Sequence, residues 1–245
     1  TDKNGIRIVT INNQKKKNAI NRPAYIALAE ILNKAAEDDK VKAVVLTGAG
    51  DYFSSGNDLT QDFEAPSDGS SMHTPMIVLV QSFIRFPKLL IGIINGPAIG
   101  IAGTIIALCD ILYASEKAYI YTPFTNLGLC AEGCSSLTFP RILGTSKANE
   151  MLQLNHKLTA QEAYKFGFVS EVYKDVSEVW KKLEQISELP LGSIIANKKL
   201  TRKFTIEELE KVNHAESDAL RERFSSEEAL MAMVNFQARK AKSKL

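Results

Sequence analysis

The chain has 245 residues, of which 45% are hydrophobic and 24% are charged. This is the composition of one globular domain and excludes a disordered or fibrous chain. Its 30 basic and 28 acidic residues leave a formal charge of +2, which excludes the broad basic surface that nucleic-acid backbones require. No apolar run reaches about 18 residues, so no membrane span is predicted.

Cysteine and histidine give no sign of a disulfide framework or of a metal site. The odd cysteine count favours a reducing compartment, and no histidine lies at ligand spacing from another histidine or a cysteine. We therefore expect no metal and read the histidines as surface or structural residues. The residues concerned are Cys109, Cys130, Cys134, His73, His156 and His214.

The N-terminal half is predicted to repeat a strand, a turn and a helix. β-branched or apolar runs indicate strands, and apolar residues at helical spacing indicate helices. The expected strands are 6–11, 41–47, 89–94, 111–114 and 118–121, and the expected helices begin at Pro23, cover 76–86 and cover about 100–109. The Ser-, Asp-, Gly- and Pro-rich stretch 60–75 is predicted to be a mobile surface loop that covers a site.

The remainder of the chain is predicted to be mostly helical. Helices are expected at 138–143, 147–154, 160–166, 178–189, 193–202, 207–224 and 227–240, with one short strand at 169–172. Without a tandem repeat or a low-complexity tract, the pattern predicts a single α/β domain: a core over 1–190 followed by a helical region over 191–245.

Two glycine turns each follow a predicted strand and lead toward a helix: Phe53-Ser54-Ser55-Gly56-Asn57-Asp58-Leu59 and Asn95-Gly96-Pro97-Ala98-Ile99-Gly100-Ile101. A helix start offers unpaired N–H groups, and glycine lets a ligand approach them, so two facing turns are able to grip one oxygen. The alternative is that glycine serves only the tight connection. Neither turn has the three-glycine spacing of a dinucleotide-binding loop.

These turns, together with Lys17-Asn18-Ala19-Ile20 and Cys109-Asp110, resemble the crotonase (enoyl-CoA hydratase/isomerase) superfamily from about residue 6 to residue 174. Within it, the stretches 123–128 and 131–136 look like the peroxisomal Δ3,Δ2-enoyl-CoA isomerases. The resemblance implies a crotonase-like ββα spiral core, an acyl-CoA thioester substrate, and no cofactor besides the coenzyme A that the substrate carries.

The resemblance also implies roles for particular residues. The backbone N–H groups of Asn57 and Ile101 would form an oxyanion hole for the thioester carbonyl, and Lys17 would approach the phosphates of coenzyme A. Alternatively, Lys17 is a solvated lysine and Asp58 only a helix N-cap. The implied substrate-binding set is Lys17, Ser54, Ser55, Gly56, Asn57, Asp58, Leu59, Gly100, Phe124 and Leu129.

Where family hydratases carry two glutamates, this chain has Thr104 and Phe124, so water addition is not expected. Glu132 stands where the isomerases keep their base; by itself it would be an acidic residue near a helix N-terminus. One carboxylate suffices to move a proton from C2 to C4 of a 3-enoyl-CoA, as in the β-oxidation of unsaturated fatty acids. Apolar neighbours, for which we suggest Phe124 and Leu129, would raise the pKa of Glu132.

Two alternatives remain: another crotonase reaction such as hydration or thioester hydrolysis, and a silent module that binds acyl-CoA, protein or RNA. The resemblance implies a homotrimer or hexamer joined through the helices of 191–245. The final Ser243-Lys244-Leu245 spells a peroxisomal address read by an import receptor, unless it is a chance end to a lysine-rich helix. A mitochondrial location stays open if a removed N-terminal segment carried a transit peptide.

Overall fold

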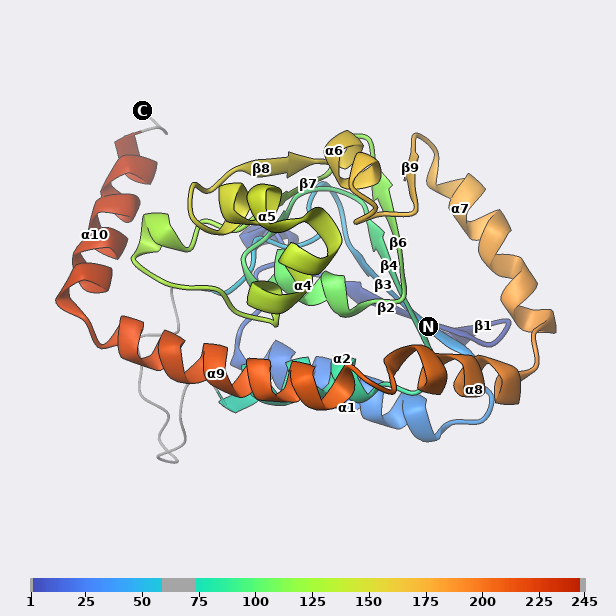
Figure 1. Cartoon of the computed structure of the whole chain (residues 1–245). Helices are drawn as coiled ribbons and strands as arrows, with labels where there is room; N and C mark the ends of the chain where they lie inside the picture. Colours follow the sequence, from blue (N-terminus) through green and yellow to red (C-terminus); the bar gives the residue numbers. More distant parts are fainter. Residues whose placement is uncertain (1, 59–73, 243–245) are drawn as a thin grey trace.

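The computed structural model describes residues 2–58 and 74–242 and has a six-stranded sheet at its centre (Figure 1). The sheet order is β1-β2-β3-β4-β6-β9, and all neighbours pair in parallel except β1, which is antiparallel to β2. The strands are β1 (Asp2–Lys3), β2 (Ile6–Ile11), β3 (Ala43–Gly48), β4 (Leu89–Ile94), β6 (Ile111–Ser115) and β9 (Glu171–Tyr173).

Both faces of this sheet are buried. Successive side chains of a strand point to opposite faces, so Val44 and Leu46 of β3 join the larger core while Ala43 and Val45 join a smaller one. Helices α1 (Arg22–Glu37) and α2 (Thr74–Arg85) contribute to the larger core, and α7 (Val176–Leu183) contributes to the smaller. This burial explains why the parallel strands are nearly continuous apolar runs.

A second sheet of three strands stands beside the first. It comprises β5 (Ala98–Ile99), β7 (Tyr119–Tyr121) and β8 (Lys157–Thr159), with β5 parallel to β7 and β7 antiparallel to β8. Because β5 directly follows β4 and directly precedes α3 (Ile101–Ile105), the chain leaves the first sheet, enters the second, and then turns into a helix. This step brings the Gly100 turn against the Gly56 turn.

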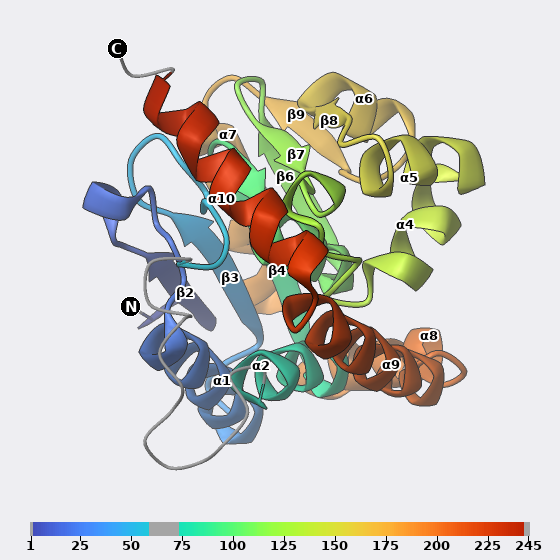
Figure 2. The ribbon, with the colours of Figure 1, turned by 90° about the vertical axis from the view of Figure 1, so that its left-hand side faces the viewer.

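The C-terminal part is helical and wraps around the sheets (Figure 1). α9 (Ile206–Phe224) lies against α2 in both views, and α10 (Glu227–Lys242) stands at the left of Figure 1, on the side that faces the viewer in Figure 2. The remaining helices are α4 (Ser135–Leu143), α5 (Thr145–Leu152), α6 (Ala160–Lys165) and α8 (Leu191–Arg202). Within the two described ranges, no helix is both long and apolar enough to span a bilayer.

The structure confirms the predicted α/β class with a helical C-terminal region, and it corrects some local details. The predicted strand at 169–172 lies at Glu171–Tyr173, and the helix expected over 178–189 ends at Leu183 and continues as a 3-10 turn. Strands β1, β5 and β8 were missed because two or three residues give too short a pattern to see. The predicted loop at 60–75 falls almost entirely outside the described residues.

Candidate active site

The two glycine turns are joined by backbone hydrogen bonds. The Ser54 N–H donates to the Pro97 carbonyl at 3.2 Å, and the Ile99 N–H donates to the Ser54 carbonyl at 3.0 Å. Gly56 has φ +83°, and a Cβ built on it would lie only 2.5 Å from the carbonyl oxygen of Ile99. Glycine is therefore required at 56 by the close approach of the two turns as well as by its own backbone conformation.

Each turn leaves one N–H group available next to its glycine. Gly100 donates its own N–H to the Tyr121 carbonyl at 2.8 Å, while Ile101 is the first residue of α3 and has no acceptor within its helix. Within residues 2–58 and 74–242, neither the Asn57 N–H nor the Ile101 N–H donates a hydrogen bond. The side chain of Asn57 is engaged separately, since its Oδ1 accepts a hydrogen bond from the Tyr25 hydroxyl.

The basic residues beside the first turn divide their roles. Lys16 Nζ forms an ion pair with the buried Asp58 carboxylate at 2.7 Å, whereas Lys17 Nζ lies 4.9 Å from the centroid of the Tyr52 ring. Backbone bonds tie this segment to the turn, because the Ser55 N–H donates to the Lys17 carbonyl at 2.9 Å. Leu59 and any residues that Asp58 would cap lie outside the described part of the chain.

The side chain of Glu132 lies next to the second glycine turn. Its side chain is only 4% exposed, and its Oε1 lies 3.8 Å from the position of a Cβ built on Gly100. The carbonyl of Glu132 accepts hydrogen bonds from the Ser135 N–H at 3.2 Å and the Ser135 hydroxyl at 2.7 Å. The structure thus brings together the carboxylate and the two glycine turns that lie over thirty residues earlier in the chain.

Gly133 packs directly on α3. A Cβ built on this residue would lie 2.5 Å from Thr104 Oγ1 and 3.0 Å from Ile101 Cδ1. Thr104 is fully buried and its hydroxyl donates to the Ile101 carbonyl at 3.1 Å. The turn Glu132-Gly133-Cys134, here called the acidic turn, fills the space beside it. Phe124 is buried and Leu129 is half-buried; their contact with the Glu132 carboxyl remains a prediction.

The nearby thiol offers no second base. Burial, reinforced by the Glu216 and Glu132 carboxylates, raises the pKa of the half-buried Cys130, which keeps this thiol protonated at neutral pH. In the described portion of the chain, no group of three histidine, cysteine, aspartate or glutamate side chains is arranged to hold a metal ion.

One residue of this region was missed from the sequence. Glu216 of α9 is 7% exposed, and its carboxylate accepts hydrogen bonds from the N–H groups of Cys134 and Ser136. The available signal was a polar residue on the core stripe of an amphipathic helix, since Glu216 falls between Leu209 and Leu220 at helical spacing and both leucines are buried.

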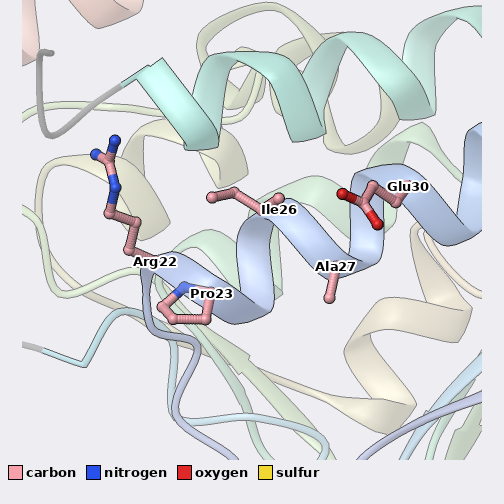
Figure 3. Close-up of a pocket in the computed structure, with 5 residues that line it drawn as sticks. All are labelled: Arg22, Pro23, Ile26, Ala27 and Glu30. Atoms are coloured by element: carbon pink, nitrogen blue, oxygen red, sulfur yellow. The ribbon is translucent and has the colours of Figure 1, made fainter. Parts of the chain in front are cut away.

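A hollow of about 340 Å³ elsewhere on the surface is not part of this site (Figure 3). Two successive turns of α1 line it, and none of the lining residues belongs to the glycine turns or the acidic turn. They are Arg22, Pro23, Ile26, Ala27 and Glu30.

Two curated proteins match almost the whole chain. Human "Enoyl-CoA delta isomerase 2" is 43% identical over 250 residues, covering 99% of this chain and 63% of its own length. Mouse "Enoyl-CoA delta isomerase 3, peroxisomal" is 42% identical, covering all of this chain and 79% of its own length. The chain thus spans less than two thirds of the human relative.

Solved structures confirm the crotonase-like fold. The enoyl-CoA hydratase/isomerase from Pseudoalteromonas atlantica superposes with a TM-score of 0.93 at 33% identity, covering 98% of this chain and 96% of that one. The family described as "Enoyl-CoA hydratase/isomerase" matches residues 1–243. With the two glycine turns and the buried acid in place, the chain belongs to the enoyl-CoA hydratase/isomerase family.

Proposed function

We propose that this protein is a Δ3,Δ2-enoyl-CoA isomerase that moves the 3-ene double bond of a fatty enoyl-CoA to the 2-trans position. Glu132 is the single acid/base group, and the N–H groups of Asn57 and Ile101 form the oxyanion hole. The observation that carries the proposal is the buried Glu132 carboxyl, whose Oε1 lies 3.8 Å from the Cβ position of Gly100. The names of the human and mouse relatives support it.

The chemistry needs only these groups. The Glu132 carboxylate removes a proton from C2, and the electron pair moves into the thioester carbonyl to give a dienolate. The same carboxyl then returns its proton to C4, so the double bond passes from C3–C4 to C2–C3. Two preorganised N–H donors stabilise the negative oxygen, and the loss of one such donor typically costs about 10²–10³ in rate. No cofactor enters this scheme.

Water addition is disfavoured by the residues around Glu132. Hydration needs a second acid/base group to position and split water, and the two places implied by the family resemblance hold Thr104 and Phe124. Thr104 is committed to the Ile101 carbonyl and packed against Gly133. A glutamate side chain at 104 would have to displace the acidic turn that carries Glu132.

The test is Glu132→Gln, assayed with 3-enoyl-CoA substrates of several chain lengths. Loss of the base should lower kcat by about 10²–10⁴-fold, while the affinity for a CoA ester stays within a few-fold because the binding groups are unchanged. The matched control is Glu208→Gln, which removes a half-exposed carboxylate that pairs with Arg141. It should leave kcat unchanged.

Three results would argue for another function. Near wild-type turnover in Glu132→Gln would show that the base is elsewhere. Rapid hydration of a 2-enoyl-CoA or hydrolysis of the thioester would favour a different crotonase reaction. Binding of CoA esters without any turnover by the wild type would favour a silent binding module.

Two further parts of the proposal concern assembly and location. A homotrimer or hexamer is supported by large apolar side chains that remain exposed on the helical region, namely Leu200, Phe204, Leu230, Met231 and Val234; light scattering of the purified protein would measure its mass. A peroxisomal location is supported by the name of the mouse relative. The tripeptide 243–245, through which an import receptor would recognise the protein, lies outside the described residues.

A further inference from the structure

Helix α4 begins without a capping side chain of its own. Its N-cap residue, Cys134, has φ +64° and makes no side-chain hydrogen bond to the first turn. Gly133 before it also has φ +64°, so two successive residues take the left-handed conformation, which is unfavourable for cysteine. The first N–H groups of a helix need acceptors from elsewhere, and a backbone in this state persists only when its surroundings hold it.

Glu216 of α9 supplies the missing acceptors. Its Oε2 accepts a hydrogen bond from the Cys134 N–H at 2.6 Å, and its Oε1 accepts one from the Ser136 N–H at 2.8 Å. A second link runs between the same elements, because Cys134 Sγ donates to the Leu209 carbonyl of α9 at 3.4 Å. The Glu216 carboxylate thereby binds the residues on both sides of Ser135. Ser135 in turn donates its N–H and its hydroxyl to the Glu132 carbonyl.

The Glu216 carboxylate, which accepts the hydrogen bonds from Cys134 and Ser136, is buried, and this burial makes the bonds effective in fixing the position of the backbone. Burial raises the pKa of Glu216, while the hydrogen bonds from Cys134 and Ser136 oppose that rise. A buried carboxylate is tolerated only when its oxygens are hydrogen-bonded, and bonds to a charged acceptor are short and directional. The helix dipole of α4 also favours a negative group at this end.

We propose that Glu216 is a positioning residue for the isomerase reaction: by clamping the Cys134 and Ser136 amides, it sets where the Glu132 carboxylate stands relative to Gly100 and the oxyanion donors. This inference rests on the proposed function. Only one residue separates Glu132 from the clamped Cys134, so a shift of the clamp is passed to the base through a single peptide unit on either side of Gly133. A displacement of about 1 Å in a reacting group costs up to about 10² in rate.

Glu216→Gln tests this most directly. The amide keeps the volume of the side chain but turns one acceptor into an N–H₂ donor, which then faces a backbone N–H. We expect kcat to fall by about 10- to 100-fold with KM changed less than about threefold, because the binding turns stay intact. If Glu216 only stabilised the fold, the variant would yield less folded protein. At equal concentrations of folded protein, its kcat and KM would then both equal those of the wild type.

The matched control is Asn213→Ala. Asn213 lies on the same buried face of α9, and its Nδ2 donates to the Ile77 carbonyl of α2 at 3.1 Å, so it joins α9 to a helix other than α4. Its loss should lower the thermal midpoint to a similar extent but change kcat less than about threefold. Wild-type kcat in Glu216→Gln, or an equal loss of kcat in Asn213→Ala, would overturn the proposal.

Structures of the wild type and of Glu216→Gln separate this inference from the proposed function. If the wild type fails to isomerise 3-enoyl-CoA, the proposed function is lost, yet a shift of the Glu132 carboxyl by about 0.5 Å or more relative to Gly100 would still support the positioning role. An unmoved carboxyl contradicts it. Failure of both Glu216→Gln and Glu216→Ala to fold would also contradict it, because Glu216 would then determine folding and not geometry.

Discussion

The two halves of the candidate active site are held in place by different means. The glycine turns are joined by backbone bonds, with Ser54 paired to both Pro97 and Ile99. The acidic turn that carries Glu132 is held in addition by a distant side chain, because Glu216 reaches it from a helix about 80 residues later. One site thus combines a half held by backbone pairing between two turns with a half that also depends on a distant carboxylate.

Each half should therefore fail under a different kind of substitution. Where backbone joins backbone, most side chains are replaceable and the damaging change is an added Cβ. Where a side chain clamps the backbone, the damaging change is loss of that side chain.

Gly56→Ala should be the most damaging change in the turn region. The new Cβ would meet the Ile99 carbonyl at 2.5 Å, so the Gly100 turn must move and carry the Ile101 N–H with it. Misplacing one oxyanion donor should cost about 10²–10³ in kcat. The measurement is steady-state turnover of a 3-enoyl-CoA at equal concentrations of folded protein.

Gly167→Ala is the control for the backbone conformation itself. Gly167 has φ +76°, close to the +83° of Gly56, but a Cβ on Gly167 meets nothing within 4 Å. In both variants the left-handed conformation of an alanine should lower the free energy of unfolding by about 1–2 kcal/mol. Only Gly56→Ala should also lower kcat. Equal kcat in the two variants would break the claim that contact between the turns sets the site.

Asn18→Ala tests whether the turn region also contains an essential side chain. Asn18 is fully buried with φ +58°, and its Nδ2 donates to the Ala49 carbonyl at 2.8 Å and the Tyr52 carbonyl at 2.7 Å. Leaving such buried groups unpaired costs about 1–3 kcal/mol. We expect that loss in the free energy of unfolding, measured with denaturant, and a smaller loss of kcat than in Gly56→Ala. A larger loss of kcat in Asn18→Ala than in Gly56→Ala would mean that the turn region also depends on a side chain.

The difference between the two halves also explains how much could be predicted from the sequence. The strand over Ile6–Ile11 alternates weakly, the strand over Leu89–Ile94 is an apolar run, and the bounds of both were predicted as the structure has them. The glycines of the two turns stand out because a turn with positive φ needs them locally. Glu132 was found only through the resemblance of its neighbours to a family, since an acid near a helix start has an ordinary explanation.

The role of Glu216 and the positions of the short strands could not be predicted from the sequence, for a physical reason. The partners of Glu216 are backbone amides about 80 residues earlier, which leave no mark in residue types. Strand β8, at Lys157–Thr159, is specified by pairing with β7 rather than by its own pattern. Contacts of this kind arise only after the chain has folded, so local propensity gives no access to them.

Asn57→Ala should have the smallest effect on kcat of the substitutions in the turn region. If Asn57 acts through its N–H, its side chain is dispensable for stabilising the oxyanion, and kcat should stay within about threefold of wild type. The change removes the acceptor of the hydrogen bond that the Tyr25 hydroxyl donates to Asn57 Oδ1, so the free energy of unfolding should fall by about 0.5–1.5 kcal/mol. A loss of kcat comparable with that of Gly56→Ala would instead mean that the amide side chain touches the substrate.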